Sequence, residues 1–235
     1  MPRIKPEEFK EWNERMITKY DPDAFHRHSN PLIQFVEKKR VRTIFELLDI
    51  QSDDSILEVG CGAANVIERA SRGRLFGVDL SAAILTKAKK QLRQEIHLFQ
   101  ADAQSLPCKN RVFQQVICSE VLEHLLDPSS ALIEISRILA TGGKAVISVP
   151  NELWINRIKW ILIRLRLFRW LMDRNGGYHE VPERMDEEWH LHSFPLEGWL
   201  QILQKFFKVA RLKRIPFVWL PLRFVILLEK PDIPA

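Results

Sequence analysis

Cysteine is scarce in this chain, and its spacing suits no metal site. The three cysteines, at positions 61, 108 and 118, are an odd number. We therefore expect a reducing compartment and no disulfide framework. Cys118 ends an apolar stretch, where a thiol is more often a small buried hydrophobic group than a nucleophile.

A secretory leader, internal repeats and low-complexity segments are also missing. The first eight residues are polar and charged, so we expect a cytoplasmic protein. The chain has 235 residues, of which 46% are hydrophobic, and this is enough for one substantial core. A single elaborated domain over residues 1–235 is therefore predicted.

Apolar stretches alternate with helical patterns through the middle of the chain. Helical spacing, broken before Pro22 and Pro31, is expected over residues 1–49. The expected strands are 56–59, 75–79, 96–100, 112–119 and 144–149, separated by helices at 62–71, 81–92 and from Asp127 to the Gly142-Gly143 turn. This order predicts a doubly wound α/β fold with right-handed crossovers. After a helix through about Phe207, the strand-like stretches 209–215 and 224–229 predict a closing antiparallel hairpin in a seven-stranded, mostly parallel sheet.

A glycine turn follows the first expected strand. Gly60 and Gly62 open a loop after Glu58, and Asp79 closes the second strand twenty-one positions after Glu58. Glycines let the backbone approach a ligand, and an acid at the end of the second strand can accept hydrogen bonds from ribose hydroxyls. The amides beyond Gly60 suit an anionic end of the ligand. The pattern therefore predicts a nucleoside site.

Further motifs make the chain resemble the class I S-adenosylmethionine-dependent methyltransferases of the small-molecule type. They follow in the family's order: Glu58-Val59-Gly60-Cys61-Gly62, Asp79-Leu80, Asp102-Ala103, Leu106-Pro107, Glu123-His124, Arg137-Ile138-Leu139 and Gly142-Gly143. The resemblance implies S-adenosylmethionine as cofactor, with Asp102 beside the adenine amino group. Ser119 and Glu120, at the end of the fourth strand, would neighbour the methionine portion. Ala64, Gln114 and Ala140-Thr141 depart from the family pattern without removing a binding residue.

The amino-terminal region and the fourth loop resemble the ubiquinone-biosynthesis O-methyltransferases. The resemblance implies that Arg27 meets the cofactor carboxylate. It also offers Glu120, Glu123 and His124 as ligands for a divalent metal, although many relatives carry the Glu-His pair without one, so a metal stays open. The predicted parts of the domain are a helical cap at 1–50, a cofactor-binding core at 51–150, a lid or insertion at 151–195, and a terminal helix and hairpin at 196–235.

Methyl transfer from a sulfonium is an in-line displacement, for which alignment in a dry pocket is the protein's main task. A hydroxyl acceptor would also need a base within hydrogen-bond reach. The candidate catalytic residues are His124, His190 and His192. The alternative for His124 is a structural hydrogen bond, and for the other two a solvated loop.

Acidic residues are absent between positions 153 and 172, where fourteen of twenty residues are apolar and five are Arg or Lys. Cations near the centre of a spanning helix are unfavourable by about 2.5–3.5 kcal/mol each, so a bilayer crossing is not expected. One interpretation is an interfacial segment on an anionic membrane surface. The other is a lid helix whose long basic side chains extend to solvent.

We therefore expect an enzyme that methylates a small-molecule or lipid-linked acceptor at oxygen. A nicotinamide dehydrogenase would share the glycine loop but not the Glu-His pair or the terminal hairpin. A nucleic-acid methyltransferase would suit the pI of about 9.2, but this chain has Ser119-Glu120-Val121-Leu122 where amino-directed base methyltransferases carry an Asn/Asp-Pro-Pro-aromatic motif. A non-catalytic cofactor-binding protein on the same fold is the remaining alternative.

Overall fold

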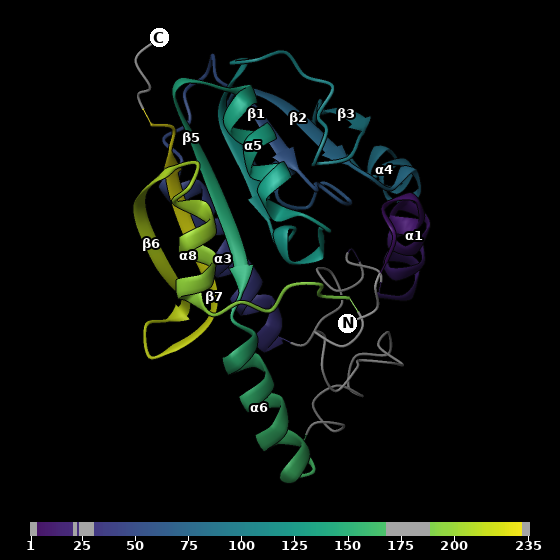
Figure 1. Cartoon of the computed structure of the whole chain (residues 1–235), viewed down its shortest axis with the longest axis vertical. Helices are drawn as coiled ribbons and strands as arrows, with labels where there is room; N and C mark the ends of the chain where they lie inside the picture. Colours follow the sequence, from purple (N-terminus) through teal and green to yellow (C-terminus); the bar gives the residue numbers. More distant parts are fainter. Residues whose placement is uncertain (1–3, 21–22, 24–30, 168–188, 232–235) are drawn as a thin grey trace.

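The computed structural model describes residues 4–20, 23, 31–167 and 189–231. A seven-stranded sheet runs through the molecule in the order β3-β2-β1-β4-β5-β7-β6 (Figure 1). The first five strands are parallel, and β7 pairs antiparallel with both β5 and β6. The strands are β1 (Ser55–Val59), β2 (Arg74–Asp79), β3 (His97–Gln100), β4 (Phe113–Ser119), β5 (Leu139–Pro150), β6 (Lys208–Phe217) and β7 (Leu220–Glu229). The predicted doubly wound sheet with a terminal antiparallel hairpin is confirmed.

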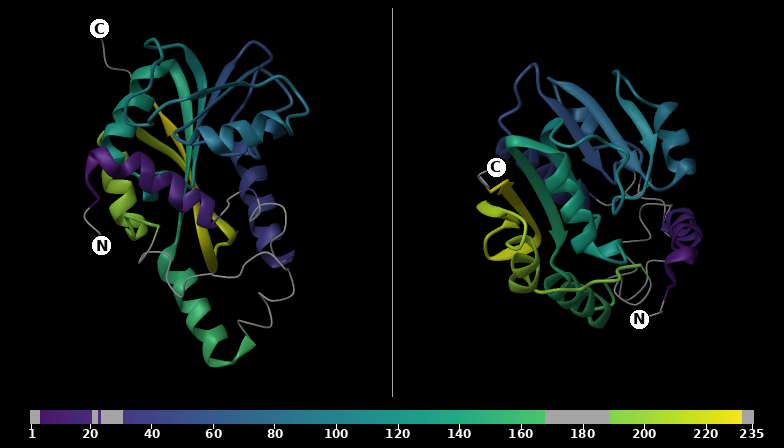
Figure 2. Two further views of the ribbon diagram at one scale, coloured as in Figure 1. Left: turned by 90° about the vertical axis from the view of Figure 1, so that its right-hand side faces the viewer. Right: turned by 45° about the horizontal axis from the view of Figure 1, so that its top comes forward.

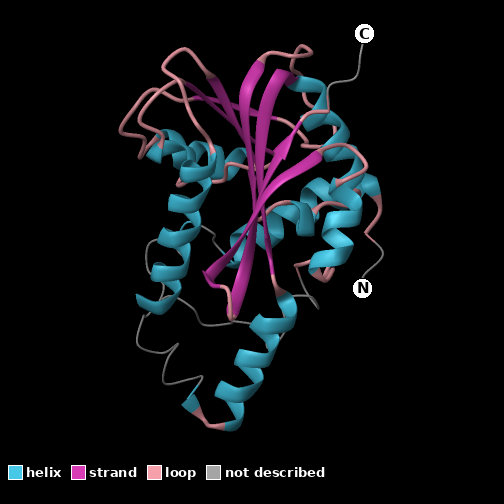
Figure 3. Ribbon diagram, turned by 90° about the vertical axis from the view of Figure 1, so that its left-hand side faces the viewer, coloured by secondary structure: helices cyan, strands magenta, loops and turns pink. Residues whose placement is uncertain are grey.

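Helices cover both faces of the sheet. The α-helices are α1 (Phe9–Tyr20), α3 (Pro31–Leu47), α4 (Ala82–Lys89), α5 (Pro128–Ile138), α6 (Glu152–Arg164) and α8 (Leu196–Leu203), with 3-10 turns η1 (Pro6–Glu8), η2 (Ile67–Arg69) and η3 (Leu122–His124). Alternate side chains along each strand enter different cores. Leu57 packs with α5 and α8, whereas Ile56 packs with α3. Figure 3 shows helices on both sides of the strands.

Two local expectations about helix starts agree with the structure. Asp127 caps α5, where its carboxylate accepts a hydrogen bond from the Ser129 amide at 2.9 Å. Ser81 caps α4 by accepting from the Ile84 amide. Ser81 also donates its hydroxyl to Glu14 at 2.7 Å, and this contact holds α1 beside α4 (Figure 2).

Two expectations about element boundaries were wrong. The helix after Gly62 is only the 3-10 turn η2, since the buried Glu58 carboxylate takes the Ile67 amide at 2.9 Å. The fifth strand begins at Leu139 and not at Lys144, because Leu139 already pairs with Phe113 across a register shift. The Gly142-Gly143 pair therefore lies inside an irregular strand and does not terminate the preceding helix.

The apolar, basic segment expected at 153–172 lies partly in α6, and the rest lies outside the described residues. α6 projects from the lower end of the sheet in Figure 1. Among the helices that the structure describes, none combines the length and apolar content required to traverse a bilayer.

Candidate functional site

A cavity of about 470 Å³ lies at the carboxyl ends of β1, β2 and β4. This is the edge at which open parallel sheets bind ligands, and the volume is in the range of small-molecule sites. Residues of α1, α3, α6 and β7, together with the segments after β3 and β4 and around His190, form the rest of the wall. Twelve of the predicted site residues line the cavity: Glu58, Gly60, Cys61, Gly62, Asp79, Leu80, Asp102, Ala103, Ser119, Glu120, His124 and His190. Arg27 lies outside the described residues, and His192 is not among the lining residues.

The glycine turn is required by backbone geometry as well as by close packing. Gly60 has φ +69°, a left-handed conformation that other residues rarely adopt. A Cβ at this position would lie 2.3 Å from Cγ2 of Val121, in the loop after β4. Gly142 has φ +72°, but a Cβ there would meet nothing within 4 Å.

The Gly60→Ala variant should therefore unfold more easily than Gly142→Ala. Both variants carry backbone strain, but only Gly60→Ala adds a clash, and overpacking of this kind lowers stability by about 1–3 kcal/mol. Urea denaturation at equilibrium measures the difference between the two free energies of unfolding. Equal losses in both variants would contradict the tight contact between the glycine turn and Val121.

Asp79 organises the loop from the end of β2. Its Oδ2 accepts from the Gly62 amide at 2.8 Å and its Oδ1 accepts from the Ser81 amide at 2.9 Å. Burial raises the pKa of this carboxyl, whereas the two backbone donors favour its charged form. The Cys61 amide donates to the Val78 carbonyl at 2.9 Å. Two loop amides that were expected to face an anionic ligand are thus already used inside the loop.

Glu58 lies beneath this loop and is buried. Burial raises its pKa to about 8, although the Ile67 amide and Arg40 favour the carboxylate. The folded protein therefore holds a proton at Glu58 that the unfolded chain has released near the ordinary value of 4.5. Burial also raises the pKa values of Cys61 and Cys118 well above the ordinary value, so both thiols stay protonated.

This buried proton predicts a pH dependence of stability. Since the folded state binds more protons than the unfolded state between about pH 4.5 and 8, the Glu58 contribution to the free energy of unfolding should fall as pH rises through that window. The slope approaches about 1.4 kcal/mol per pH unit. Glu58→Gln keeps an acceptor for the Ile67 amide but cannot titrate, so it should remove this pH-dependent part of the free energy of unfolding. Denaturant titrations of both proteins from pH 5 to 8 make the comparison; parallel curves would contradict the raised pKa.

Asp102 and its neighbours occupy the cavity wall after β3. Asp102 Oδ1 accepts from the Gln104 amide at 2.8 Å, so the residue caps a turn while also lining the cavity. The Leu80 carbonyl accepts from the Gln100 side chain at 2.7 Å. Ala103 adds a small apolar side chain to the same wall.

Ser119 and Glu120 take part in a buried charged network. Arg40 of α3 donates to Glu37 and to the Ser119 hydroxyl, and Ser119 contacts Ser148 at 2.8 Å. The Ser148 hydroxyl donates to Glu120 Oε1 at 2.8 Å. Glu120 Oε2 lies 2.6 Å from Nε of Arg223 on β7. Burial alone would lower the pKa values of both arginines, but Glu37 and Glu120 raise them, so both guanidinium groups stay charged.

Three histidines lie near the other end of the cavity. His190 Nδ1 is hydrogen-bonded to Glu152 Oε1, at the start of α6. The His124 and His190 rings meet edge to face with centroids 4.8 Å apart. Burial, and then the adjacent His190, hold the pKa of His124 well below its ordinary value, so His124 is neutral. His192 instead donates to the Leu125 carbonyl at 2.9 Å and stacks on Phe194.

The potential metal ligands differ from the predicted trio. Glu123, His124 and His190 each offer one ligand atom, and these atoms lie within 4.8 Å of one another. Glu120 is not in this group because it pairs with Arg223. Burial, followed by the nearby Glu120, raises the pKa of Glu123 well above its ordinary value, so this carboxyl is neutral without a bound cation.

Sequence reasoning missed Glu37, Arg40, Glu152 and Arg223, all of which line the cavity. Two signals were available. Glu37 and Arg40 stand three positions apart among the apolar positions of a helix, and Glu152 closely follows the end of the fifth strand. Arg223 has no local signal, since an antiparallel strand far along the chain delivers it.

Comparisons with known proteins find similarity to methyltransferases over part of the chain. A family model described as "Methyltransferase domain" matches residues 57–147. A ubiquinone biosynthesis O-methyltransferase of Nitrosomonas europaea is 30% identical over 119 residues, which are 48% of this chain and 51% of that protein. A ubiquinone biosynthesis O-methyltransferase of Rhodopseudomonas palustris is 26% identical over 214 residues, which are 82% of this chain and 81% of that protein. The chain spans about half or less of several curated relatives, such as 39% of an uncharacterized methyltransferase of Schizosaccharomyces pombe.

Solved structures share the fold over nearly the whole chain. The N-methyltransferase NodS from Bradyrhizobium japonicum, in complex with S-adenosyl-L-homocysteine, superposes with a TM-score of 0.64 at 18% identity and covers 95% of this chain and 99% of its own. A possible histamine N-methyltransferase from Thermotoga maritima gives 0.65 at 18% identity, with 95% and 100% covered. These neighbours confirm the predicted Rossmann-like fold.

Proposed function

We propose that this chain, whose residues 57–147 match a methyltransferase domain, is an S-adenosylmethionine-dependent enzyme that methylates an apolar small-molecule or lipid-linked acceptor at oxygen. The observation that carries the proposal is that one cavity is lined both by the glycine turn and Asp79 and by the His190–Glu152 pair. The family model and the S-adenosyl-L-homocysteine bound in the NodS structure support S-adenosylmethionine as the cofactor.

We assign one half of the cavity to the cofactor because acids lie there at the ends of β2 and β3. Asp79 is placed to accept from the ribose hydroxyls, since each of its oxygens keeps a lone pair beyond the backbone bond that it already accepts. Asp102 is placed to accept from the adenine amino group, and Gly60 lets the backbone approach the ligand. The bound cofactor supplies an electrophilic methyl group that needs alignment more than activation.

The acceptor half is apolar and is built by the helices at the ends of the sheet. Ile155, Ile158 and Leu162 of α6 and Leu32 and Ile33 of α3 line it. Such a wall excludes water and binds an acceptor through apolar contact. The names of the ubiquinone-biosynthesis relatives support oxygen as the methylated atom and a lipid-linked molecule as the acceptor.

A hydroxyl acceptor must lose a proton, and we assign His190 as the base that takes it. Both Glu152 and His190 line the cavity, and their hydrogen bond through Nδ1 leaves Nε2 available to take the acceptor proton. Glu152 orients the ring and stabilises the imidazolium that results, and His124 packs against the ring as a neutral neighbour. Arg40, Arg223 and Glu120 hold the end of β4 in place between the two halves.

The membrane surface is the proposed partner of α6. Trp160 and Ile161 are exposed on this helix, and Arg157 and Arg164 lie over the rings of Trp154 and Trp160. Cations beside aromatic rings suit the boundary between anionic headgroups and acyl chains.

Calorimetric titration with S-adenosyl-L-homocysteine tests the cofactor site, and transfer of a tritiated methyl group tests the reaction. Phenols with and without an isoprenoid tail serve as acceptors, and label is counted in the organic extract. Micromolar binding with faster labelling of the tailed phenol would support the proposal. Binding with labelling only of amines would overturn the oxygen acceptor, and no binding would overturn the cofactor site.

A further inference from the structure

The hairpin between β6 and β7 ends in exposed apolar residues. Val218 and Trp219 form its two-residue turn and are 75% and 72% exposed. Such turns usually carry glycine, asparagine or aspartate, so bulky apolar side chains there are unusual. The Phe217 and Trp219 rings stack in parallel with centroids 5.0 Å apart, so the tip presents a preformed aromatic surface.

This surface continues onto the start of α3. Phe35 is 45% exposed and its ring lies 6.1 Å from that of Phe217. Leu32, one turn earlier on the same helix, is exposed and also lines the apolar half of the cavity. We call Leu32, Phe35, Phe217, Val218 and Trp219 the hairpin patch. It runs from the molecular surface to the wall of the acceptor site.

The two strands of the hairpin carry basic side chains and no acid before Glu229. Residues 208–228 contain five Arg or Lys side chains and no Asp or Glu. Arg211, Lys213 and Arg214 are exposed along β6, and the Lys39 ammonium lies 4.8 Å from the centre of the Phe217 ring. An anionic partner with an apolar interior complements both the rings and the cations.

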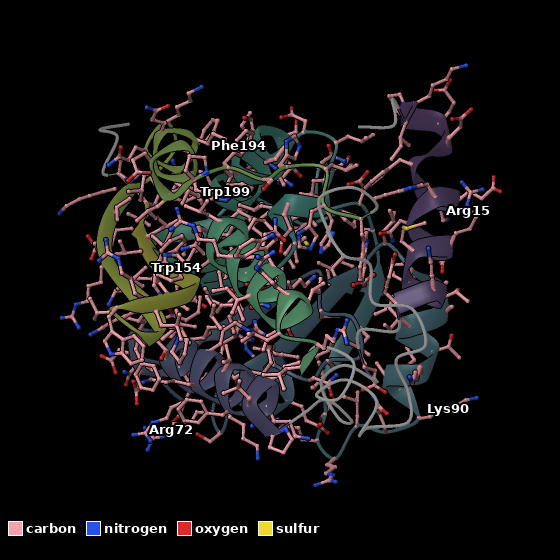
Figure 4. The ribbon with its side chains drawn as sticks, turned by 90° about the horizontal axis from the view of Figure 1, so that it is seen from below. Arg15, Arg72, Lys90, Trp154, Phe194 and Trp199 are labelled. Carbon is pink, nitrogen blue, oxygen red and sulfur yellow. The ribbon has the colours of Figure 1, made fainter. Side chains whose placement is uncertain are left out.

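The hairpin patch and α6 lie at the same end of the molecule. Figures 1 and 3 show the tip of the hairpin beside the base of α6, and α6 contacts β7. Figure 4 looks onto this end, with Trp154 of α6 labelled beside the two strands. Leu32 of α3 and Ile155 and Ile158 of α6 all line the cavity.

We infer that the hairpin patch docks on an anionic lipid bilayer and, as a second contact besides α6, turns the apolar end of the cavity towards the membrane. This inference rests on the proposed methylation of a lipid-linked acceptor. With Trp219 at headgroup depth and the β6 cations on the lipid phosphates, an acceptor headgroup enters beside Leu32 while its tail stays in the bilayer. Docking at two separate elements fixes the orientation of the protein, which one helix alone would not do.

Co-sedimentation of the whole chain with vesicles tests the inference. The unmodified protein and the double variant Val218→Ser/Trp219→Ser are each mixed with two kinds of vesicle. One is phosphatidylcholine alone, and the other also contains about 30% phosphatidylglycerol, which supplies the anionic surface that attracts basic segments. Loss of two apolar side chains that would enter the bilayer should lower the partition coefficient at least about tenfold. Ile133→Ser, which changes an equally hydrophobic side chain that is 51% exposed on α5, is the matched control and should bind as the unmodified protein does.

Affinity for S-adenosyl-L-homocysteine is measured on the same samples, since the hairpin turn is not part of the cavity. The expected result for the double variant is unchanged cofactor affinity with a vesicle partition coefficient at least about tenfold lower. Equal vesicle binding by the double variant and Ile133→Ser would overturn the inference while leaving the proposed reaction intact. A concentration-dependent dimer that the double variant abolishes, without vesicle binding, would overturn it in favour of contact with a second copy. If the unmodified protein does not bind S-adenosyl-L-homocysteine, the result instead refutes the proposed function.

Discussion

Replacement of His190 by glutamine should lower kcat for methyl transfer by about 10²–10⁴-fold, the usual contribution of a positioned general base. The glutamine side chain cannot take the acceptor proton, although it can still fill the space beside His124. The dissociation constant of S-adenosyl-L-homocysteine should stay unchanged, since His190 lies at the acceptor end of the cavity. Single-turnover transfer to a phenol measures the chemical step without product release.

Two variants separate a catalytic role from a structural one. His192→Gln, two positions along the same segment, changes a side chain that bonds the Leu125 carbonyl and does not line the cavity, so kcat should stay within about twofold of the unmodified enzyme. Glu152→Gln should lower kcat less than His190→Gln and alter the pH profile of kcat, because the ring keeps a partner but loses a negative charge. Equal kcat values for His190→Gln and His192→Gln would refute the assignment of His190 as the base.

The fold was predictable because the signals for its core are local. Strands buried on both faces appear as unbroken apolar stretches such as Val116–Cys118, and an aspartate followed by proline starts α5. The exceptions have specific causes. Glu58 takes the amide that a longer helix after the glycine turn would use, and the Gly142-Gly143 pair was interpreted as a helix end although Leu139 already belongs to a strand.

One side of the candidate site, formed by the glycine loop and the ends of β2 and β3, was predictable from the sequence. Its residues each come directly after an apolar stretch that can be recognised as a strand. The opposite side depends on packing. Glu120 was expected beside the methionine portion, but Arg223 lies against it because β7 runs antiparallel to β5, at a place that no short motif encodes. The pairing of His190 with Glu152 likewise brings together residues 38 positions apart. Spacing identified the histidines as candidates but could not separate His190 from His192.

Replacement of Asp79 by alanine should weaken the binding of S-adenosyl-L-homocysteine by about 100-fold or more. The variant would lose the two charge-assisted hydrogen bonds that we propose Asp79 makes with the ribose, each contributing about 1.5–3 kcal/mol. It also leaves the Gly62 and Ser81 amides without their acceptor, so the loop around the cofactor would be less ordered. Titration calorimetry measures the change in affinity.

The loss of a carboxylate that accepts from backbone amides would destabilise any protein, so the control must reproduce that loss away from the cavity. Asp127→Ala does so, because Asp127 accepts from the Ser129 amide at the start of α5 and lies outside the cavity wall. Loss of such a cap lowers stability by about 0.5–2 kcal/mol. If Asp79 acts on the ribose, Asp127→Ala lowers stability without changing affinity, and Asp79→Ala changes both. Unchanged affinity in a folded Asp79→Ala protein would mean that the acid at the end of β2 orders the glycine loop only, and the nucleoside site would then have to be assigned to other residues.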